Sequence, residues 1–414
     1  MTLEIDSARL LSEIEELALI SEAPPPAVTR IVFTPADMRA RAWLIERCKA
    51  ADLQVRQDAI GNTFACWQGS NPTARAVGTG SHIDAIPNAG KYDGVVGVLG
   101  GLEAIRALRR AGFHPQNSIE LLLFTSEEPT RFGIGCLGSR LLSGTLSPQA
   151  ARNLTDHNGQ SLEETRRAAG FTGELEEVKL PAGYYKAFVE LHIEQGPVLE
   201  RERVPLGVVT RIAAPASARV SIEGAGGHAG SVLMPDRHDA LCAASELILT
   251  IEAAARTSGS IDTVATVGMC EVFPGAVNSI PSRVRISVDV RDTDIARRDG
   301  VMRGLESAAQ QISEHRGVRV GIELVNADAP AECAPEVVQA ISAACGKHKQ
   351  KHLQMISRAY HDSLFMSRIA PVGMLFIPCR NGHSHRPDEY ASIEDITRGT
   401  LVLAETLASL SATN

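Results

Sequence analysis

The sequence is poor in aromatic residues and has neither basic blocks nor long apolar runs. Aromatic side chains make up only 4% of the 414 residues, which argues against the base-stacking surfaces that bind single-stranded nucleic acid. Lysine and arginine total 41 against 49 acidic residues, so the formal charge is −8. A mildly acidic chain of this kind is a poor candidate for binding nucleic acid or an anionic membrane. No segment reaches the roughly 18 consecutive apolar residues that a membrane span needs.

The eight cysteines are scattered and include no C-x-x-C pair. This pattern indicates neither a disulfide framework nor a thiolate zinc site, and it fits free thiols in a reducing compartment. Residues 1–15 carry acidic side chains among the apolar ones and lack the basic start and apolar run of a signal peptide. We therefore expect a cytoplasmic protein with no nucleic-acid or membrane partner.

The length predicts two domains, because single hydrophobic cores stop growing at roughly 250–300 residues. Residues 76–80 are predicted to form a strand, residues 95–110 a helix and the apolar run 119–124 a further strand covered on both faces. Strand, helix and strand in turn are typical of a three-layer α/β domain. The sequence therefore predicts an α/β fold for the first part of the chain.

The middle of the chain has a different pattern. Residues 283–290 alternate, with Val284, Ile286, Val288 and Val290 on one face, and a helix is predicted from about 237 to 255. Alternation of this kind is typical of an antiparallel sheet that is open on one side. We expect a smaller α+β domain at 212–328 that interrupts a larger domain made of residues 1–211 and 329–414.

Side chains that can bind metal gather at the ends of the predicted strands. They are His82, Asp84, Asp93, Glu127, Glu128, His192 and His385. Taken singly, each has an ordinary structural explanation, such as a turn aspartate or a surface acid. Open α/β sheets place their sites outside the carboxyl ends of the strands, so we expect these groups to meet at one place.

Histidine together with carboxylate suits zinc, manganese, nickel or cobalt better than calcium or magnesium. The expected ligands are His82, Asp93, Glu128, His192 and His385. Five ligands exceed the needs of one tetrahedral zinc and fit two ions about 3.5–4 Å apart, with Asp93 as the bridge. We expect Asp84 to orient His82 through its second ring nitrogen. Glu127 would then remain free to accept the proton of a metal-bound water.

The segments that carry these residues resemble those of the binuclear metal amidohydrolases of the hydantoinase/carbamoylase group, which are relatives of aminoacylase and the carboxypeptidase G type peptidases. The segments are 82–84, 93–94, 127–128, 191–196 and 384–385. The resemblance implies a three-layer mixed-sheet metallohydrolase domain interrupted by a smaller α+β dimerisation domain. It also implies two divalent metal ions per subunit, with manganese favoured, and a homodimer joined through the inserted domain.

The same resemblance implies further roles. It makes Glu127 the general base and His228, in the glycine-flanked stretch 226–230, a stabiliser of the oxyanion that acts within or across subunits. Asn278 and Arg291 would hold the substrate carboxylate. The substrate-side residues that we expect are Gln195, Asn278, Arg291, Tyr360 and His361.

Three stretches look most like the ureidoglycolate amidohydrolases of plants: 212–217, 227–235 and 356–366. We therefore expect hydrolysis of the ureido C–N bond of a small carboxylate, with ureidoglycolate as the first choice. Allantoate and N-carbamoyl-L-amino acids remain alternative substrates. A metallopeptidase or aminoacylase, and a catalytically silent homologue, also remain open.

Overall fold

The computed structural model describes residues 2–412, which divide into two compact units. Unit 1 contains the chain up to Thr210, then Glu332–Ser357 and the residues from His361 onward. Unit 2 contains Arg211–Ala331 and, in addition, the short stretch Arg358–Tyr360. The sequence does not foresee that stretch as part of the inserted unit, because it lies far along the chain from 212–328.

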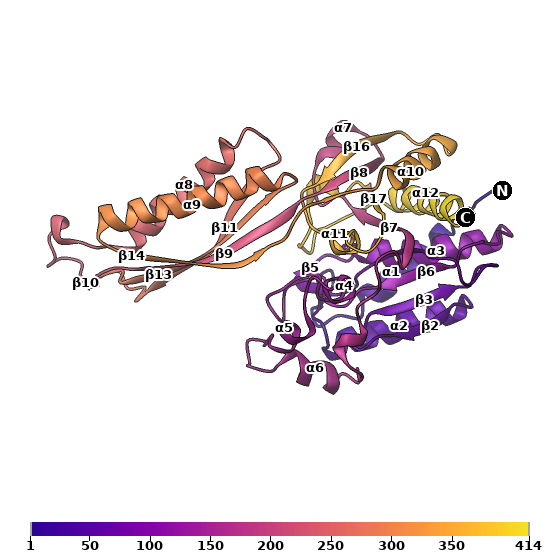
Figure 1. Cartoon of the computed structure of the whole chain (residues 1–414), viewed down its shortest axis with the longest axis horizontal. Helices are drawn as coiled ribbons and strands as arrows, with labels where there is room; N and C mark the ends of the chain where they lie inside the picture. The colour runs from indigo at the N-terminus through magenta and orange to yellow at the C-terminus, as the bar shows by residue number, and fades with distance from the viewer. Residues whose placement is uncertain (1, 413–414) are drawn as a thin grey trace. The chain divides into compact units, whose positions relative to one another are not determined.

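The larger sheet has nine strands, four of which form a parallel centre (Figure 1). In order they are β15 (Ala331–Glu332), β8 (Leu206–Ile212), β17 (Val372–Ile377), β7 (Tyr185–Ile193), β4 (Ala76–Ser81), β6 (Ile119–Leu123), β3 (Thr63–Trp67) and β2 (Gln54–Gln57), while β16 (His352–Ser357) pairs with β8. The pairs β17–β7, β7–β4 and β4–β6 are all parallel. Their carboxyl ends therefore lie at one edge of the sheet, where α/β proteins place their sites.

Helices cover both faces of this sheet. One core contains residues of α1 (Ser7–Ala18), α2 (Pro35–Ala50), α3 (Val95–Arg110), α10 (Pro335–Lys347) and α12 (Ile393–Ser411). The other contains residues of α4 (Leu137–Ser143), α5 (Pro148–Arg152), α6 (Leu162–Ala168) and α11 (Asp362–Met366). Leu121 and Leu123 of β6 belong to the first core and Leu122 to the second, as strand alternation requires. The predicted three-layer α/β fold is thereby confirmed.

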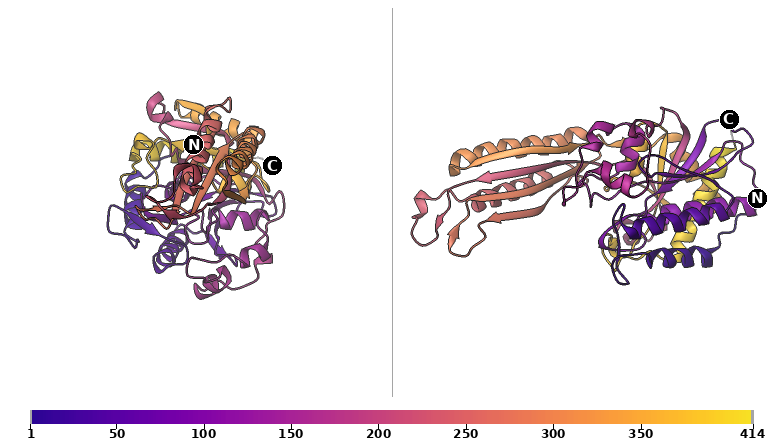
Figure 2. Two further views of the ribbon diagram at one scale, coloured as in Figure 1. Left: turned by 90° about the vertical axis from the view of Figure 1, so that its left-hand side faces the viewer. Right: turned by 90° about the horizontal axis from the view of Figure 1, so that it is seen from below.

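Unit 2 is built on a four-stranded antiparallel sheet. Its order is β11 (Val264–Phe273), β13 (Arg283–Asp292), β9 (Ala214–Glu223) and β14 (Arg319–Ala327). Helices α8 (Ala240–Arg256) and α9 (Ile295–Arg316) lie side by side on one face of it (Figures 1 and 2). Val284, Ile286, Val288 and Val290 are buried beneath them, which confirms the predicted apolar face. Arg219 and Arg285 lie exposed on the strands.

Shorter elements complete the chain. They are β1 (Val28–Arg30) paired with β5 (Ala85–Ala89), β10 (Gly227–His228) paired with β12 (Ser279–Ile280), the helix α7 (Val198–Glu202), and the single 3₁₀ turns η1 (Leu175–Glu177), η2 (Met234–Asp236) and η3 (Arg380–Gly382). The N–H of Cys333 donates to the carbonyl oxygen of Thr210 at 2.9 Å. The two ends of the interruption in unit 1 are therefore hydrogen-bonded neighbours. Among residues 2–412, no helix combines the length and the apolar character that crossing a membrane requires.

Candidate metal centre

The four parallel strands deliver most of the expected ligands to one edge of the sheet. His82 follows β4, Glu127 and Glu128 come shortly after β6, and His192 lies near the end of β7. His385 lies beyond β17, in the loop after η3. Asp93 comes just before α3, whose N-cap residue is Gly94 with a φ of 65°. The expected convergence of these segments is therefore present in the fold.

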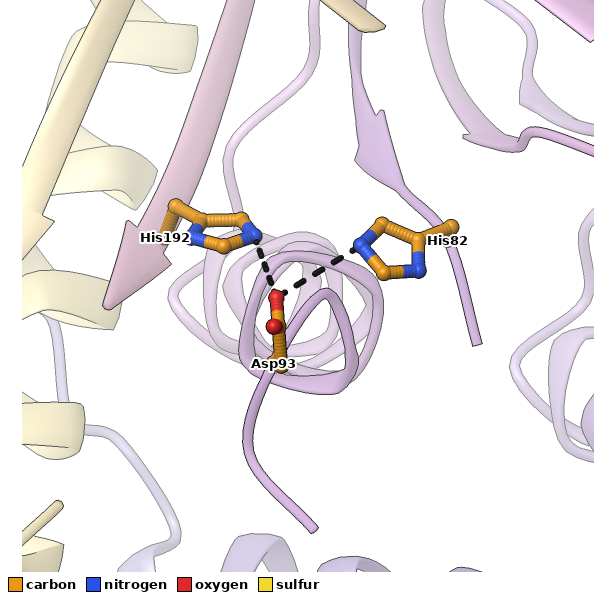
Figure 3. Close-up of side chains that lie close together, drawn as sticks. All are labelled: His82, Asp93 and His192. Atoms are coloured by element: carbon orange, nitrogen blue, oxygen red, sulfur yellow. Dashed lines mark ion pairs between the residues drawn. The ribbon is translucent and has the colours of Figure 1, made fainter. Parts of the chain in front are cut away.

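The Asp93 carboxylate lies between two buried histidines (Figure 3). Its Oδ1 atom is 3.1 Å from Nε2 of His192 and 3.6 Å from Nε2 of His82. These three side chains form a group that could hold a metal ion. All three are less than a tenth exposed, so the group is shielded from water.

The second oxygen of Asp93 faces a second group. Its Oδ2 atom lies 3.2 Å from Nε2 of His385, and the same nitrogen lies 3.2 Å from Oε1 of Glu128. Asp93, Glu128 and His385 form a further group that could hold a metal ion. One carboxylate therefore presents one oxygen to each of two adjacent candidate sites, which is the arrangement expected of a bridging ligand.

Backbone carbonyls orient the two buried imidazoles. Nδ1 of His82 is 3.0 Å from the carbonyl oxygen of Asp84, and Nδ1 of His192 is 2.9 Å from that of Ile193. A carbonyl oxygen only accepts, so each Nδ1 donates and each Nε2 is turned toward Asp93. Burial lowers the pKa of His82, but the charges of Glu127 and Asp93 outweigh it and raise this pKa well above its ordinary value.

Asp84 contacts the second ring nitrogen of His82, as expected, but it does so through its backbone oxygen. This oxygen accepts the hydrogen bond from Nδ1, while the nearer carboxylate oxygen is 3.7 Å away. The carboxylate instead accepts from the backbone N–H groups of Glu127 (3.2 Å) and Glu128 (3.0 Å). Asp84 therefore fixes the turn that carries both glutamates, and burial raises its own pKa to about 6.

Glu127 lies beside the candidate ligands. Its Oε2 atom is 3.8 Å from Nε2 of His82, and its Oε1 atom is 3.4 Å from Sγ of Cys136, which can donate a weak hydrogen bond. Burial, reinforced by the neighbouring charge of Glu128, raises the pKa of Glu127 well above its ordinary value. A buried carboxyl group with a raised pKa next to a metal site is suited to accept and return a proton.

Gln195 and His361 also adjoin this centre. Gln195, with a φ of 53°, donates from Nε2 to Oδ2 of Asp93 at 2.8 Å and to Oγ of Ser384 at 3.1 Å. The ring of His361 lies 4.4 Å from that of His192, centroid to centroid, and its Nε2 is 3.0 Å from Oγ of Ser357. The structure therefore places both of these expected residues next to the candidate ligands.

Glu389 supports the centre although it is not among the residues expected from the sequence. Its Oε1 atom accepts hydrogen bonds from the backbone N–H groups of Tyr92 (2.9 Å) and Asp93 (3.1 Å), and its Oε2 atom accepts from Ser384 (3.0 Å). Burial raises the pKa of Glu389 to about 7. In the sequence it stands among charged residues beyond His385 and looks like an exposed acid.

Glu190 is a second supporting residue outside the expected set, although the sequence carries a signal for it. It is an acid inside the apolar strand β7, and it is fully buried. Ser81 donates to its Oε1 atom at 2.7 Å, and the Ser363 hydroxyl donates to its Oε2 atom at 2.6 Å. Together with His192 and His361 it forms a third group that could hold a metal ion. A buried acid needs such partners, so its place in an apolar strand could have marked it.

The other expected site residues, namely His228 and the substrate-side residues Asn278, Arg291 and Tyr360, lie in unit 2 and form two pairs. The N–H of Ala229, next to His228, donates to the carbonyl oxygen of Asn278 at 2.9 Å. His228 lies on β10, and Asn278 immediately precedes the adjacent strand β12. The guanidinium of Arg291 lies 5.2 Å from the ring centroid of Tyr360. Its Nε donates to Asp289 at 2.7 Å.

His228 is exposed, and its Nδ1 accepts a hydrogen bond of 3.1 Å from the N–H of Gly230. In a neutral imidazole, a nitrogen that accepts leaves the proton on the other nitrogen. Nε2 of His228 is thereby available as a donor.

Comparisons with known proteins identify the family of the chain. Residues 78–409 match the model of peptidase family M20/M25/M40. The ureidoglycolate hydrolase of Arabidopsis thaliana is 51% identical, over 99% of this chain and 88% of its own. The N-carbamoyl-L-amino acid amidohydrolase of Geobacillus stearothermophilus is 38% identical, over 98% and 99%.

Solved structures give the same result. The crystal structures of AtUAH in complex with glyoxylate and with (S)-hydroxyglycine each match with a TM-score of 0.92 and 51% identity, over 99% of this chain and 98% of theirs. An amidase of the hydantoinase/carbamoylase family from Burkholderia vietnamiensis matches with a TM-score of 0.92 and 32% identity, over 99% and 98%. The chain therefore belongs to peptidase family M20/M25/M40, and within it to the hydantoinase/carbamoylase amidohydrolases.

Proposed function

We propose that this protein is a metal-dependent amidohydrolase that converts ureidoglycolate to glyoxylate, carbon dioxide and two molecules of ammonia. The observation that carries the chemistry is the position of Asp93 between two candidate metal sites, with Glu127 beside them. The choice of substrate rests on the 51% identity to a ureidoglycolate hydrolase over nearly the whole chain. AtUAH, which is also 51% identical to this chain, has been crystallised in complex with glyoxylate and with (S)-hydroxyglycine. These two compounds are the final product and the intermediate that precedes it in such a reaction.

The donor set suits two divalent cations, with manganese as our first choice and zinc, nickel or cobalt as alternatives. The residues that would hold them are His82, Asp93, Glu128, His192 and His385. Bound there, the cations would supply Lewis acidity to the ureido carbonyl and to the attacking water. Asp84, Gln195 and Glu389 would keep the ligand loops in place through the hydrogen bonds described above.

In the proposed reaction Glu127 removes a proton from the attacking water and returns it to the leaving ammonia. His228 donates from Nε2 to the oxyanion of the tetrahedral intermediate, and the guanidinium of Arg291, with Asn278, binds the substrate carboxylate. Tyr360 and His361 would complete the pocket. The products are ammonia and a carbamate, which loses carbon dioxide to give hydroxyglycine and then glyoxylate with a second ammonia. We further propose a homodimer joined through unit 2.

The test is ammonia release by the manganese-loaded protein from ureidoglycolate, allantoate, an N-carbamoyl-L-amino acid and a dipeptide. We expect ureidoglycolate to give a kcat/KM at least about tenfold above the others, because a pocket that fails to pair one polar group costs about 1–3 kcal/mol. The stoichiometry should be two ammonia per glyoxylate. If an N-carbamoyl amino acid is preferred, with one ammonia per amino acid, the substrate assignment is wrong and the amidohydrolase chemistry stands.

A further inference from the structure

A cavity of about 570 Å³ opens in unit 1 at a place that none of the expected metal ligands lines. One part of its wall comes from α7 with the residues that follow it, and from the loop 349–351 between α10 and β16. The other part comes from residues 378–380 after β17, and from residues 390–398, which lead into α12 and include its first turns. Four separate stretches of the chain therefore share one cavity.

The wall carries more positive than negative charge. The cationic side chains are Arg203, Lys349, Lys351, Arg380 and Arg398, and the acidic ones are Glu200 and Asp395. Both acids already have partners, because Asp395 pairs with Arg398 at 2.8 Å and Glu200 accepts from the N–H of Asn381 at 2.7 Å. Among residues 2–412, no carboxylate lies within ion-pair distance of Arg203, Lys349 or Lys351. In a chain with a net charge of −8, such a cavity favours an anionic ligand.

The loop that carries the two lysines is anchored at its start. Lys347 donates to Oε1 of Glu405 at 2.5 Å, and Nε2 of His348 lies 3.2 Å from the other oxygen of the same carboxylate. Glu405 belongs to α12, so this helix fixes the beginning of the loop. The side chains of Lys347 and His348 are engaged by Glu405, so Lys349 and Lys351 are the cations that this loop presents to the cavity.

The wall also offers an aromatic and apolar surface. Tyr390 is 41% exposed, and the guanidinium of Arg380 lies 4.5 Å from its ring centroid. Apolar side chains complete this part of the wall: Leu199, Val204, Pro205 and Pro378. A ligand that fits both parts of the wall has several negative charges and an apolar or aromatic body.

Three of the wall segments continue directly into the candidate metal centre. The segment of Leu199 begins at Gln195, which donates to Asp93. The segment of Arg380 leads to His385, and Tyr390 follows Glu389, which holds the backbone of Asp93. The wall segments are also tied together, because the N–H of Arg380 donates to the carbonyl oxygen of Tyr390 at 2.8 Å.

We propose that this cavity is a second binding site, for a small organic anion with at least two negative charges and an apolar or aromatic body, and that its occupancy alters the metal centre through the shared wall segments. A nucleoside monophosphate has this chemistry and is the probe of choice. Inorganic phosphate carries the negative charge but lacks the apolar or aromatic part. The site does not depend on which ureido acid the enzyme hydrolyses, because it is separate from the catalytic residues.

Calorimetry on the full-length, manganese-loaded protein tests the site, with adenosine monophosphate and inorganic phosphate as separate probes. We expect adenosine monophosphate to bind more tightly than phosphate and to weaken as salt is raised, because exposed charges are screened. The double variant Lys349→Glu/Lys351→Glu should lose at least about tenfold in affinity, since two attractive charges become repulsive. Unchanged affinity in this variant overturns the proposal.

Two matched variants locate the bound probe. Arg39→Glu/Lys49→Glu makes the same change in net charge on α2, outside the cavity, and should keep the affinity of the unaltered protein. Glu128→Gln weakens the metal centre and should retain most of the affinity for adenosine monophosphate, because the probe does not bind the metals. If the α2 variant loses as much as the cavity variant, binding reflects net charge alone. If Glu128→Gln abolishes binding, the probe binds the metals. Either result overturns the site.

The coupling has its own readout, which is independent of turnover. The rate at which a chelator removes manganese should change at least about twofold when adenosine monophosphate saturates the protein, and should not change in the Lys349→Glu/Lys351→Glu variant. Saturating binding with an unchanged rate of metal loss would show that the cavity is isolated from the metal centre, which overturns the second half of the proposal.

Discussion

The carboxylate of Glu389 accepts a hydrogen bond of 3.1 Å from the backbone N–H of Asp93. The same oxygen accepts from the preceding N–H, of Tyr92, and the other oxygen accepts from Ser384, one residue before His385. Glu389 thus joins the loop that carries the bridging aspartate to the loop that carries the last histidine. It positions ligands and is not itself among the groups expected to bind metal.

Removing Glu389 should therefore weaken metal binding. We expect Glu389→Ala to lower manganese affinity about 10–100-fold, as loss of a hydrogen-bond partner of metal ligands typically does. Glu389→Gln, which keeps one acceptor oxygen, should lose much less. A competition titration with a fluorescent chelator measures both. Asp388→Ala, at an exposed neighbour, is the control, and an unaltered affinity in Glu389→Ala would contradict the positioning role.

Glu127→Gln should separate turnover from metal binding. Because Glu127 lies outside all three candidate metal groups, the variant should keep its manganese content while kcat falls about 10²–10⁴-fold, the usual contribution of a general base. Metal analysis and ammonia release on the same preparation give both quantities. Glu128→Gln, in contrast, should lose metal. Full turnover in Glu127→Gln would remove Glu127 from the mechanism.

Metal removal should destabilise the protein more as the pH rises. The contacts to Asp93 and Glu128 raise the pKa of His385 to about 11, and burial raises that of Glu389 to about 7. A histidine with a raised pKa stabilises the fold fully below its unfolded value of about 6.5 and loses this contribution toward pH 11. Folding also favours the protonated form of Glu389. Its contribution to the free energy of unfolding therefore falls as the pH rises from about 4.5 to 7.

A metal cation can replace the proton of His385 and compensate the nearby charge of Glu389, so the gain in Tm on manganese loading should increase between about pH 6 and 8.5. Thermal melts of stripped and loaded protein at several pH values measure the gain. The stripped protein should show a falling Tm over this range. A gain that is independent of pH would mean that these groups do not exchange protons for metal.

His228→Ala should lower kcat about 10²–10³-fold, the typical cost of losing one oxyanion donor. His238→Ala, at another exposed histidine of unit 2, is the matched control and should retain activity. If His228 acts across a dimer, mixing the inactive His228→Ala and Glu127→Gln subunits should restore part of the activity. Verified mixed dimers without recovery would place His228 within its own subunit.

Arg291→Lys should raise KM more than it lowers kcat, because lysine cannot bind a carboxylate through two parallel hydrogen bonds. We expect a rise of about tenfold. Arg285→Lys makes the same exchange at an exposed position of the same strand and should leave both constants unchanged. A fall in kcat alone would argue against a role in holding the substrate carboxylate.

Much of the fold could be predicted because periodicity reports burial. The helix expected at 95–110 has those bounds in the structure, and the buried face of β13 follows its alternating valines and isoleucine. The strands expected at 76–80 and 119–124 each differ from the structure by one residue at one end. The metal-ligand candidates could be found because strand ends of a parallel sheet converge, and that rule depends on topology alone.

The residues that support the site could not be found in the same way. Glu389 acts through its contacts to backbone N–H groups, and its neighbours in sequence are ordinary surface residues. The role of Asp84 was inferred from its closeness to His82, but the turn that carries Glu127 and Glu128 comes within reach of its carboxylate only in the folded sheet. Such contacts join segments about 40 to 300 residues apart, so local patterns in the sequence do not reveal them.

The hydrogen bond from Cys333 to Thr210 gives the chain a modular design. The interruption of unit 1 begins and ends at neighbouring points, and all five proposed metal ligands lie outside residues 211–331. A gene that exchanged this insert for another would leave every ligand and its supporting loops encoded as before. The metal ligands and the substrate contacts that we propose for the insert can therefore evolve on separate stretches of the same polypeptide.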